Sequence, residues 1–162
     1  MTLLLARRLI LACGNTLRSD DGIGPWLAQW AEEKFLDDPN IRVITRQQWT
    51  PDLAEDISQA DSILFIDCSI ESAPGSVRLI DVEPSAPTQG LATHHQGAPE
   101  LLALTRDLYN SHPRAVSLLT IGAGSTELGE TFSEPVLDAI PEACRLLEQT
   151  ILNRLQDQSY LK

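Results

Sequence analysis

The chain has 162 residues, a formal net charge of −11 at pH 7 and 43% hydrophobic residues. This length suits a single domain, residues 1–162, with one hydrophobic core. A strongly acidic surface repels the phosphates of nucleic acids and anionic lipids, so we expect neither a nucleic acid nor a membrane as a partner.

The cysteines and the start of the chain bear on its location. The chain has three cysteines, an odd number, and they form no CxxC pair: Cys13, Cys68 and Cys144. This argues against a disulfide framework and against a thiolate zinc site, and it fits a reducing cytoplasm. Arg7 and Arg8 interrupt the apolar opening, whereas a signal peptide carries its charges before its apolar stretch. We therefore expect a buried first strand and a cytoplasmic protein.

Strand and helix patterns alternate from the first residues onward. Residues 9–13 are a continuous apolar run, which is typical of a strand covered on both faces. From Ile23 the apolar residues follow a helical spacing that includes Trp26 and Trp30, both expected in the core. Further strands are expected over 41–45, 62–67 and 115–121, an edge strand over 77–82, a loop over 84–97, and helices over 51–57, 101–109 and 135–155. The alternation predicts an α/β fold, a three-layer sandwich with a mostly parallel twisted sheet and helices on both faces.

The polar residues at the predicted strand ends are candidates for a site, because such sheets bind ligands beyond the carboxyl ends of their strands. Asp20 and Asp21 lie in the first turn, where one carboxylate is explained by helix capping, worth about 1 kcal/mol. Two neighbouring carboxylates repel, which a cation would relieve, so we expect one to cap and the other to face the crevice. Asp67 ends an apolar strand, either as a turn former or as a functional carboxylate.

Histidines supply the remaining candidate ligands. His94 and His95 lie in the long loop, while His112, in a Ser-His-Pro turn, is interpreted as structural. Two carboxylates and one imidazole form a mixed set that suits Zn²⁺, Ni²⁺, Mn²⁺ or Fe²⁺ and leaves open positions for a substrate.

Other chemistries find little support. No glycine pattern completes a dinucleotide fingerprint or a P-loop, and the first turn is acidic, so neither a nucleotide nor a flavin is expected. Cys13 and Cys68 follow apolar runs and are interpreted as buried and unreactive. No GxSxG nucleophile motif occurs.

The stretch GNTLRSDDGIG, residues 14–24, resembles the G-N-x-L-x-x-D-[DE]-x-x-G signature of the hydrogenase maturation endopeptidases, which remove a C-terminal extension from the large subunit of [NiFe] hydrogenases. The segments ILFIDCS, THHQGAPELLAL and TIGAGSTELGETFSEPV resemble later parts of the family in the same order, so the resemblance covers nearly the whole chain. It implies an endopeptidase whose partner is the hydrogenase large subunit precursor. It also implies that the substrate presents the nickel.

Individual roles follow from the same resemblance. It implies Asp21, Asp67 and His94 as the catalytic and metal-binding residues, with His95 as the alternate to His94. The QWTPDLA segment is similar to the branch that serves bidirectional, NAD(P)-linked hydrogenases, and Trp49 and Thr50 within it are expected to recognise the substrate. Two other functions stay open: a flavodoxin-like binding or electron-transfer module, and a metal-dependent hydrolase of small peptides or amides.

Overall fold

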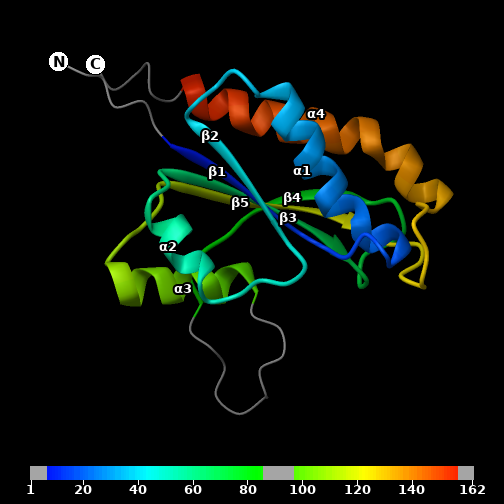
Figure 1. Cartoon of the computed structure of the whole chain (residues 1–162), viewed down its shortest axis with the longest axis horizontal. Helices are drawn as coiled ribbons and strands as arrows, with labels where there is room; N and C mark the ends of the chain where they lie inside the picture. Colours follow the sequence, from blue (N-terminus) through cyan, green and yellow to red (C-terminus); the bar gives the residue numbers. More distant parts are fainter. Residues whose placement is uncertain (1–6, 86–96, 157–162) are drawn as a thin grey trace, which may run out of the picture.

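A computed structural model of the chain describes residues 7–85 and 97–156. Five strands form one twisted sheet in the order β2-β1-β3-β5-β4 (Figure 1). They are β1 (Arg8–Cys13), β2 (Ile41–Arg46), β3 (Ser62–Ser69), β4 (Val77–Asp81) and β5 (Ala115–Gly122). All neighbours pair in parallel except β4, which pairs antiparallel with β5 at one edge. The edge position predicted for residues 77–82 is therefore confirmed.

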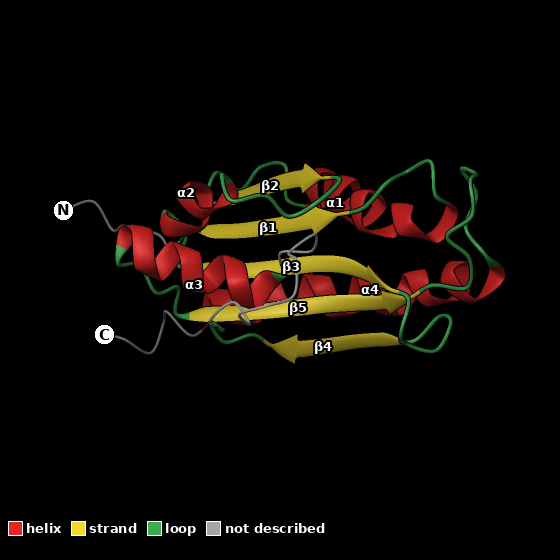
Figure 2. Ribbon diagram, turned by 90° about the horizontal axis from the view of Figure 1, so that it is seen from below, coloured by secondary structure: helices red, strands yellow, loops and turns green. Residues whose placement is uncertain are grey.

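Helices cover both faces of the sheet and complete three layers (Figures 1 and 2). One face carries α1 (Ile23–Lys34) and α4 (Glu134–Gln156), and the other carries α2 (Leu53–Ser58) and α3 (Ala98–Tyr109). A short 3₁₀ helix, η1 (Ser19–Gly22), precedes α1. The predicted α/β sandwich is confirmed, and the observed elements differ from the predicted ones by three residues or fewer at their ends.

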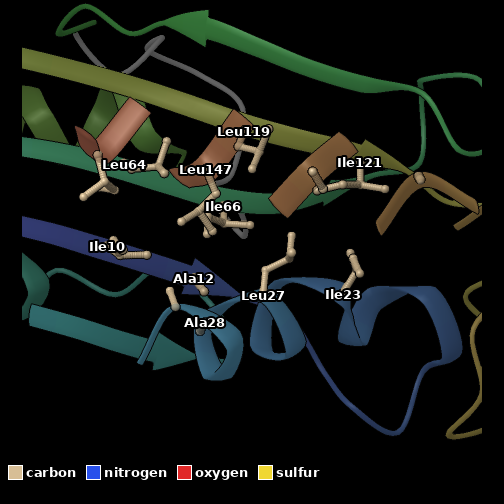
Figure 3. Close-up of a cluster of buried hydrophobic side chains, with 14 of the residues drawn as sticks. Ile10, Ala12, Ile23, Leu27, Ala28, Leu64, Ile66, Leu119, Ile121 and Leu147 are labelled. Atoms are coloured by element: carbon tan, nitrogen blue, oxygen red, sulfur yellow. The ribbon is translucent and has the colours of Figure 1, made fainter. Parts of the chain in front are cut away.

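Two hydrophobic cores lie on the two faces of the sheet. Alternate residues of each central strand enter one core or the other, which explains why the strand sequences are continuously apolar. The first core joins the sheet to α1 and α4 (Figure 3) and includes Ile10, Leu64, Ile66, Leu119, Leu27 and Leu147. The second joins the sheet to α2 and α3 and includes Leu11, Ile63, Phe65, Leu53 and Leu101.

The expectation that Trp26 belongs to the core is wrong. Its side chain is 38% exposed, because the buried face of α1 is formed by Ile23, Leu27 and Ala31. Trp30 is partly buried at the margin of the first core. The apolar spacing identified the helix correctly but did not fix which of its apolar residues point inward.

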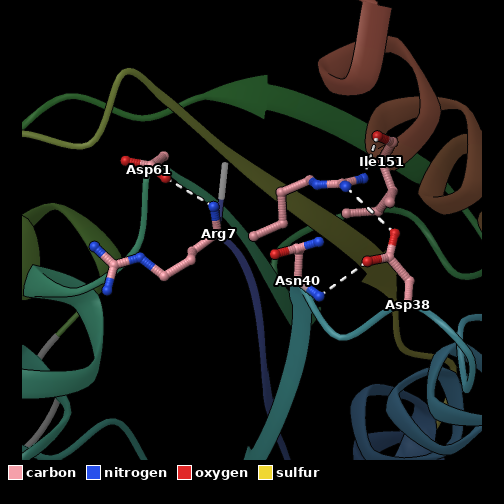
Figure 4. A network of polar contacts seen from close by, with 6 residues as sticks. Arg7, Asp38, Asn40, Asp61 and Ile151 are labelled. Carbon is pink, nitrogen blue, oxygen red and sulfur yellow. Dashed lines mark hydrogen bonds and ion pairs between the residues drawn. The ribbon is translucent and has the colours of Figure 1, made fainter. Parts of the chain in front are cut away.

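The two arginines that interrupt the apolar opening anchor the start of β1 (Figure 4). The Arg7 amide donates to the Asp61 carboxylate at 2.7 Å. The Arg8 guanidinium is buried, pairs with Asp38 at 3.3 Å and donates to the Ile151 carbonyl of α4 at 3.4 Å. Burial lowers the pKa of Arg8, and the Asp38 carboxylate partly opposes this. Arg8 therefore ties the start of β1 to α4 and to the turn between α1 and β2.

Candidate functional site

The strand order places a crevice between β1 and β3. From β1 the chain passes to β2 on one side and then to β3 on the other, so the connections leaving the carboxyl ends of β1 and β3 diverge. Open α/β sheets bind ligands at such a switch point. Asp21 follows β1, and Asp67 lies near the end of β3. The topology therefore brings these two predicted site residues to the same end of neighbouring strands.

The turn between β1 and α1 holds Asp21 in a fixed position. The Asn15 amide donates to Asp21 Oδ2 at 2.7 Å, and the Asn15 side chain accepts from the Leu17 amide at 2.9 Å. A Cβ atom on Gly14 would collide with the Asp21 carbonyl oxygen, and one on Gly24 with the Cys13 carbonyl oxygen. The two glycines therefore let α1 begin directly against the end of β1.

Asp20 has a different role from the capping expected for one of the two adjacent acids. Neither η1 nor α1 has a side-chain cap, so the capping prediction is wrong. The fully buried Asp20 carboxylate instead accepts hydrogen bonds from the amides of Gly124, Ser125 and Ser133 and from the Ser133 hydroxyl, at 2.7–2.9 Å. Burial alone would raise its pKa, but these hydrogen bonds outweigh burial and hold the pKa below its ordinary value.

Further hydrogen bonds fasten the first turn to the segment after β5. The Gly129 amide donates to the Leu17 carbonyl at 2.9 Å, and the Ser19 amide donates to the Gly129 carbonyl at 2.8 Å. The Ser19 hydroxyl also donates to the Glu127 carbonyl at 2.8 Å. Two loops more than 100 residues apart in sequence thus form one rigid unit around Asp20. Sequence reasoning missed this contact, although the unexplained second carboxylate was a signal for it.

Asp67 is a strongly perturbed acid. Its pKa is raised to about 6, mainly by burial; a 2.8 Å hydrogen bond from the Cys68 amide lowers the pKa, and the negative charge of Asp21 adds to the rise. Asp21 and Asp67 lie at the same end of the neighbouring strands β1 and β3, and the effect of Asp21 on the pKa of Asp67 is consistent with this placement. A cation between them would relieve both their repulsion and the burial of negative charge.

Two thiols lie beside these acids and stay protonated. The pKa of Cys13 is raised to about 12, mainly by burial and then by the negative charges of Asp67 and Asp21. The pKa of Cys68 is likewise raised to about 12, mainly by burial and then by the negative charges of Asp21 and Asp67. A thiol with such a pKa is a poor nucleophile at neutral pH. The prediction of unreactive cysteines is supported, although Cys68 is only partly buried.

The histidines expected to complete the metal site, His94 and His95, lie outside the described residues. Within 7–85 and 97–156, no three His, Cys, Asp or Glu side chains gather in an arrangement that could hold a metal ion. The described part of the site therefore offers two carboxylates, and its third ligand stays a prediction. His112 lines a cavity of about 440 Å³ near the beginning of β5, away from Asp67, which fits its structural interpretation.

The predicted recognition residues follow β2, at the same end of the sheet as the two acids. The Trp49 ring is half-buried and meets the Phe65 ring edge-on, with centroids 5.3 Å apart. Thr50 is also half-buried, and its carbonyl accepts from the Leu53 amide at the start of α2. Both residues thus lie near the site, but Trp49 also packs on the second core.

No helix in the described parts of the chain has the length and apolarity needed to cross a membrane.

Comparison with known proteins gives a consistent picture. No family model matches the chain. It is 26% identical over 153 residues to the hydrogenase expression/formation protein HoxM of Azotobacter vinelandii, covering 90% of this chain and 72% of that protein. It is 23% identical over 150 residues to the hydrogenase 2 maturation protease of Escherichia coli K12, and the match covers 86% of this chain and 91% of that protein. The solved structure of the hydrogenase maturating endopeptidase HybD from E. coli matches its fold with a TM-score of 0.73 and 20% identity, over 94% and 93% of the two chains.

Proposed function

We propose that this chain, which is related in sequence and fold to the [NiFe] hydrogenase maturation proteases, is the endopeptidase that removes the C-terminal extension of a nickel-loaded hydrogenase large subunit precursor. The observation that carries the proposal is the placement of two carboxylates, Asp21 and Asp67, at the switch point of the sheet. A relationship of fold alone would not assign a function, whereas these residues are the ones that the resemblance in sequence implies.

The chemistry of the pair fits a metal that arrives with the substrate. Asp21 and Asp67 supply oxygen ligands, and His94, or His95 in its place, supplies a nitrogen ligand. Nickel held by the precursor adds binding energy only when the precursor is loaded, so an empty precursor docks poorly. The metal then acts as a template, polarises the scissile carbonyl or activates a water molecule.

The surroundings of the acids suit a protein substrate. Three exposed apolar residues lie on loops at the carboxyl end of the parallel strands: Leu17 (55% exposed), Ile70 (79%) and Leu128 (82%). Leu17 and Leu128 are on the two loops that the Gly129 hydrogen bonds join. Apolar side chains exposed around a site are typical of a surface that binds another protein. The three cysteines are free, which fits a cytoplasmic location.

The two alternative functions have less support. A flavodoxin-like module needs a phosphate-binding loop after β1, but that loop carries Asp21 and is held by the buried Asp20. A hydrolase of small peptides would need no protein-binding surface around the acids. The relatives reported above favour neither alternative.

A processing assay tests the proposal. The nickel-loaded precursor and the nickel-free precursor are each incubated with the purified chain, and loss of the extension is followed by mass spectrometry. We expect cleavage only with nickel, and loss of cleavage in Asp21→Ala and Asp67→Ala. If these variants process the precursor at the wild-type rate, the assigned site is wrong. His94→Ala and His95→Ala, tested separately, identify the third ligand.

A further inference from the structure

The sheet face that carries Asp67 is only partly covered by described helices. Figure 2 shows α3 lying over the beginnings of β3 and β5. A groove of about 510 Å³ lies towards the other ends of these strands and includes Ser69, Thr120, Arg78 and Ile80. Its size falls within the usual range of about 300–1,000 Å³ for ligand sites. Among the described residues this groove is open beside the carboxyl ends of β3 and β5, which is where sheets of this kind bind ligands.

The groove lies beside Asp67 in the sheet, although Asp67 itself does not line it. Asp67 on β3 pairs in register with Thr120 on β5, and Thr120 pairs with Arg78 on β4. The three residues form one row across the sheet. Since neighbouring strands lie about 4.8 Å apart, the row places Arg78 about 10 Å from Asp67 along the groove.

The wall of the groove is rigid and rich in hydroxyl groups. Gly75 donates to the Gly122 carbonyl at 2.8 Å and Ala123 to the Ser69 carbonyl at 2.9 Å, which fastens the loop between β3 and β4 to the end of β5. Ser76 is a lining residue whose hydroxyl oxygen is buried without a hydrogen-bond partner in the described structure, while the Ser72 hydroxyl donates to the Ser69 hydroxyl at 2.9 Å. A hydroxyl both donates and accepts, so such a wall matches the amides and carbonyls of a peptide backbone.

The side chains beyond this wall indicate what the peptide carries. Arg78 is exposed and forms no ion pair with the described residues, while the molecule around it has a net charge of −11. Ile80, on the same face of β4, is 45% exposed and provides an apolar surface. Glu71 also lines the groove, and among the described residues that line it Arg78 alone is positively charged.

We infer that this groove binds the polypeptide segment of the precursor that flanks the scissile bond, in an extended conformation, and that Arg78 pairs with a carboxylate of that segment. An extended chain advances about 3.3 Å per residue, so a row of about 10 Å places this carboxylate three residues from the scissile bond. The inference rests on the proposed function and adds to it the position at which substrate sequence is recognised.

Steady-state processing of the nickel-loaded precursor tests the groove separately from the function. We expect Arg78→Glu to raise KM about tenfold and to change kcat less than twofold, because the contact binds ground state and transition state alike. Arg145→Glu is the matched control, since it reverses the same charge on the exposed surface of α4. If wild type does not cleave, the proposed function fails. If wild type cleaves and both variants share its KM, the groove inference fails while the function stands.

A charge swap and a cross-link test the position itself. A precursor with lysine three residues from the scissile bond, on the side that faces Arg78, should restore the KM of Arg78→Glu; no rescue on either side of the bond would overturn the assigned spacing. A photoreactive benzoylphenylalanine in place of Ile80 should cross-link within about five residues of the bond. Cross-links confined to other parts of the precursor would place the segment outside the groove. Far-UV circular dichroism checks that each variant is folded.

Discussion

Replacing Asp67 by asparagine should stabilise the fold at neutral pH while it abolishes processing. The asparagine oxygen can still accept the hydrogen bond from the Cys68 amide, so the change removes charge without removing this contact. Burial is the main reason that the pKa of Asp67 rises from 3.8 to about 6, with the Asp21 carboxylate adding to it. The ionised Asp67 carboxylate therefore destabilises the folded state, and the neutral asparagine amide should remove this destabilisation.

The sign and the size follow from proton linkage. Asp67 binds its proton more tightly in the folded state, so it destabilises the folded state progressively as pH rises from about 4 to 6. A shift of about two pKa units corresponds to about 3 kcal/mol at pH 7.5, of which about 2 kcal/mol develops between pH 4.5 and 7.5. For a chain of this length, 3 kcal/mol raises the melting temperature by roughly 6–12 °C.

Urea denaturation at pH 4.5 and 7.5, in buffer with a chelator, measures the effect. The stability difference between Asp67→Asn and wild type should grow with pH by about 2 kcal/mol. Asp37→Asn is the control, because it removes the same charge from an exposed residue of this acidic protein. The stability difference between Asp67→Asn and wild type could instead stay constant with pH, or Asp37→Asn could show the same pH dependence. Either result would refute the view that burial near Asp21 causes the effect.

Three further substitutions test how the site is supported. Asp20→Ala should lower the free energy of unfolding at pH 7 by about 3 kcal/mol in urea denaturation, because three partly buried amides and the Ser133 hydroxyl lose their acceptor; a loss below about 1 kcal/mol would contradict this role. Gly24→Ala should cost at least about 2 kcal/mol, since its Cβ meets the Cys13 carbonyl, and a wild-type melting temperature would show that α1 can move away. Arg8→Leu should cost about 2 kcal/mol by urea denaturation, through loss of the Asp38 pair and the carbonyl contact, while the processing rate of the folded protein stays at the wild-type value; a processing defect would show that Arg8 affects the site.

Sequence patterns predicted the architecture because strand burial and helix spacing are local properties. The apolar run 9–13 became the fully buried β1, and the polar interruptions of 77–82 marked the only antiparallel strand of the described sheet. The switch-point rule also selected the turn that holds Asp20 and Asp21 and the strand end at Asp67, and the site roles of Asp21 and Asp67 stay predictions. The elements themselves were predicted because period and position along the chain suffice to infer them.

The errors arose where distant segments meet. Asp20 binds Gly124, Ser125 and Ser133, which lie more than 100 residues further along the chain, and no local pattern connects them. A carboxylate before a helix is usually a cap, so the local interpretation favoured the wrong partner. The role of Trp49 in recognition stays a prediction, and its ring contact with Phe65 of β3 is another long-range contact that no local pattern indicates.

The three acids of the site divide stability and function between them. Asp20 ionises easily because four donors surround it, and its contribution to stability is present above pH 4 and lost as pH falls through its lowered pKa. Asp67 behaves in the opposite way, since its charge opposes folding above pH 6. A protein selected for stability alone would keep the first carboxylate and replace the second. The unfavourable carboxylate therefore needs a reason other than stability, and the proposed binding of a cation brought by the substrate would supply one.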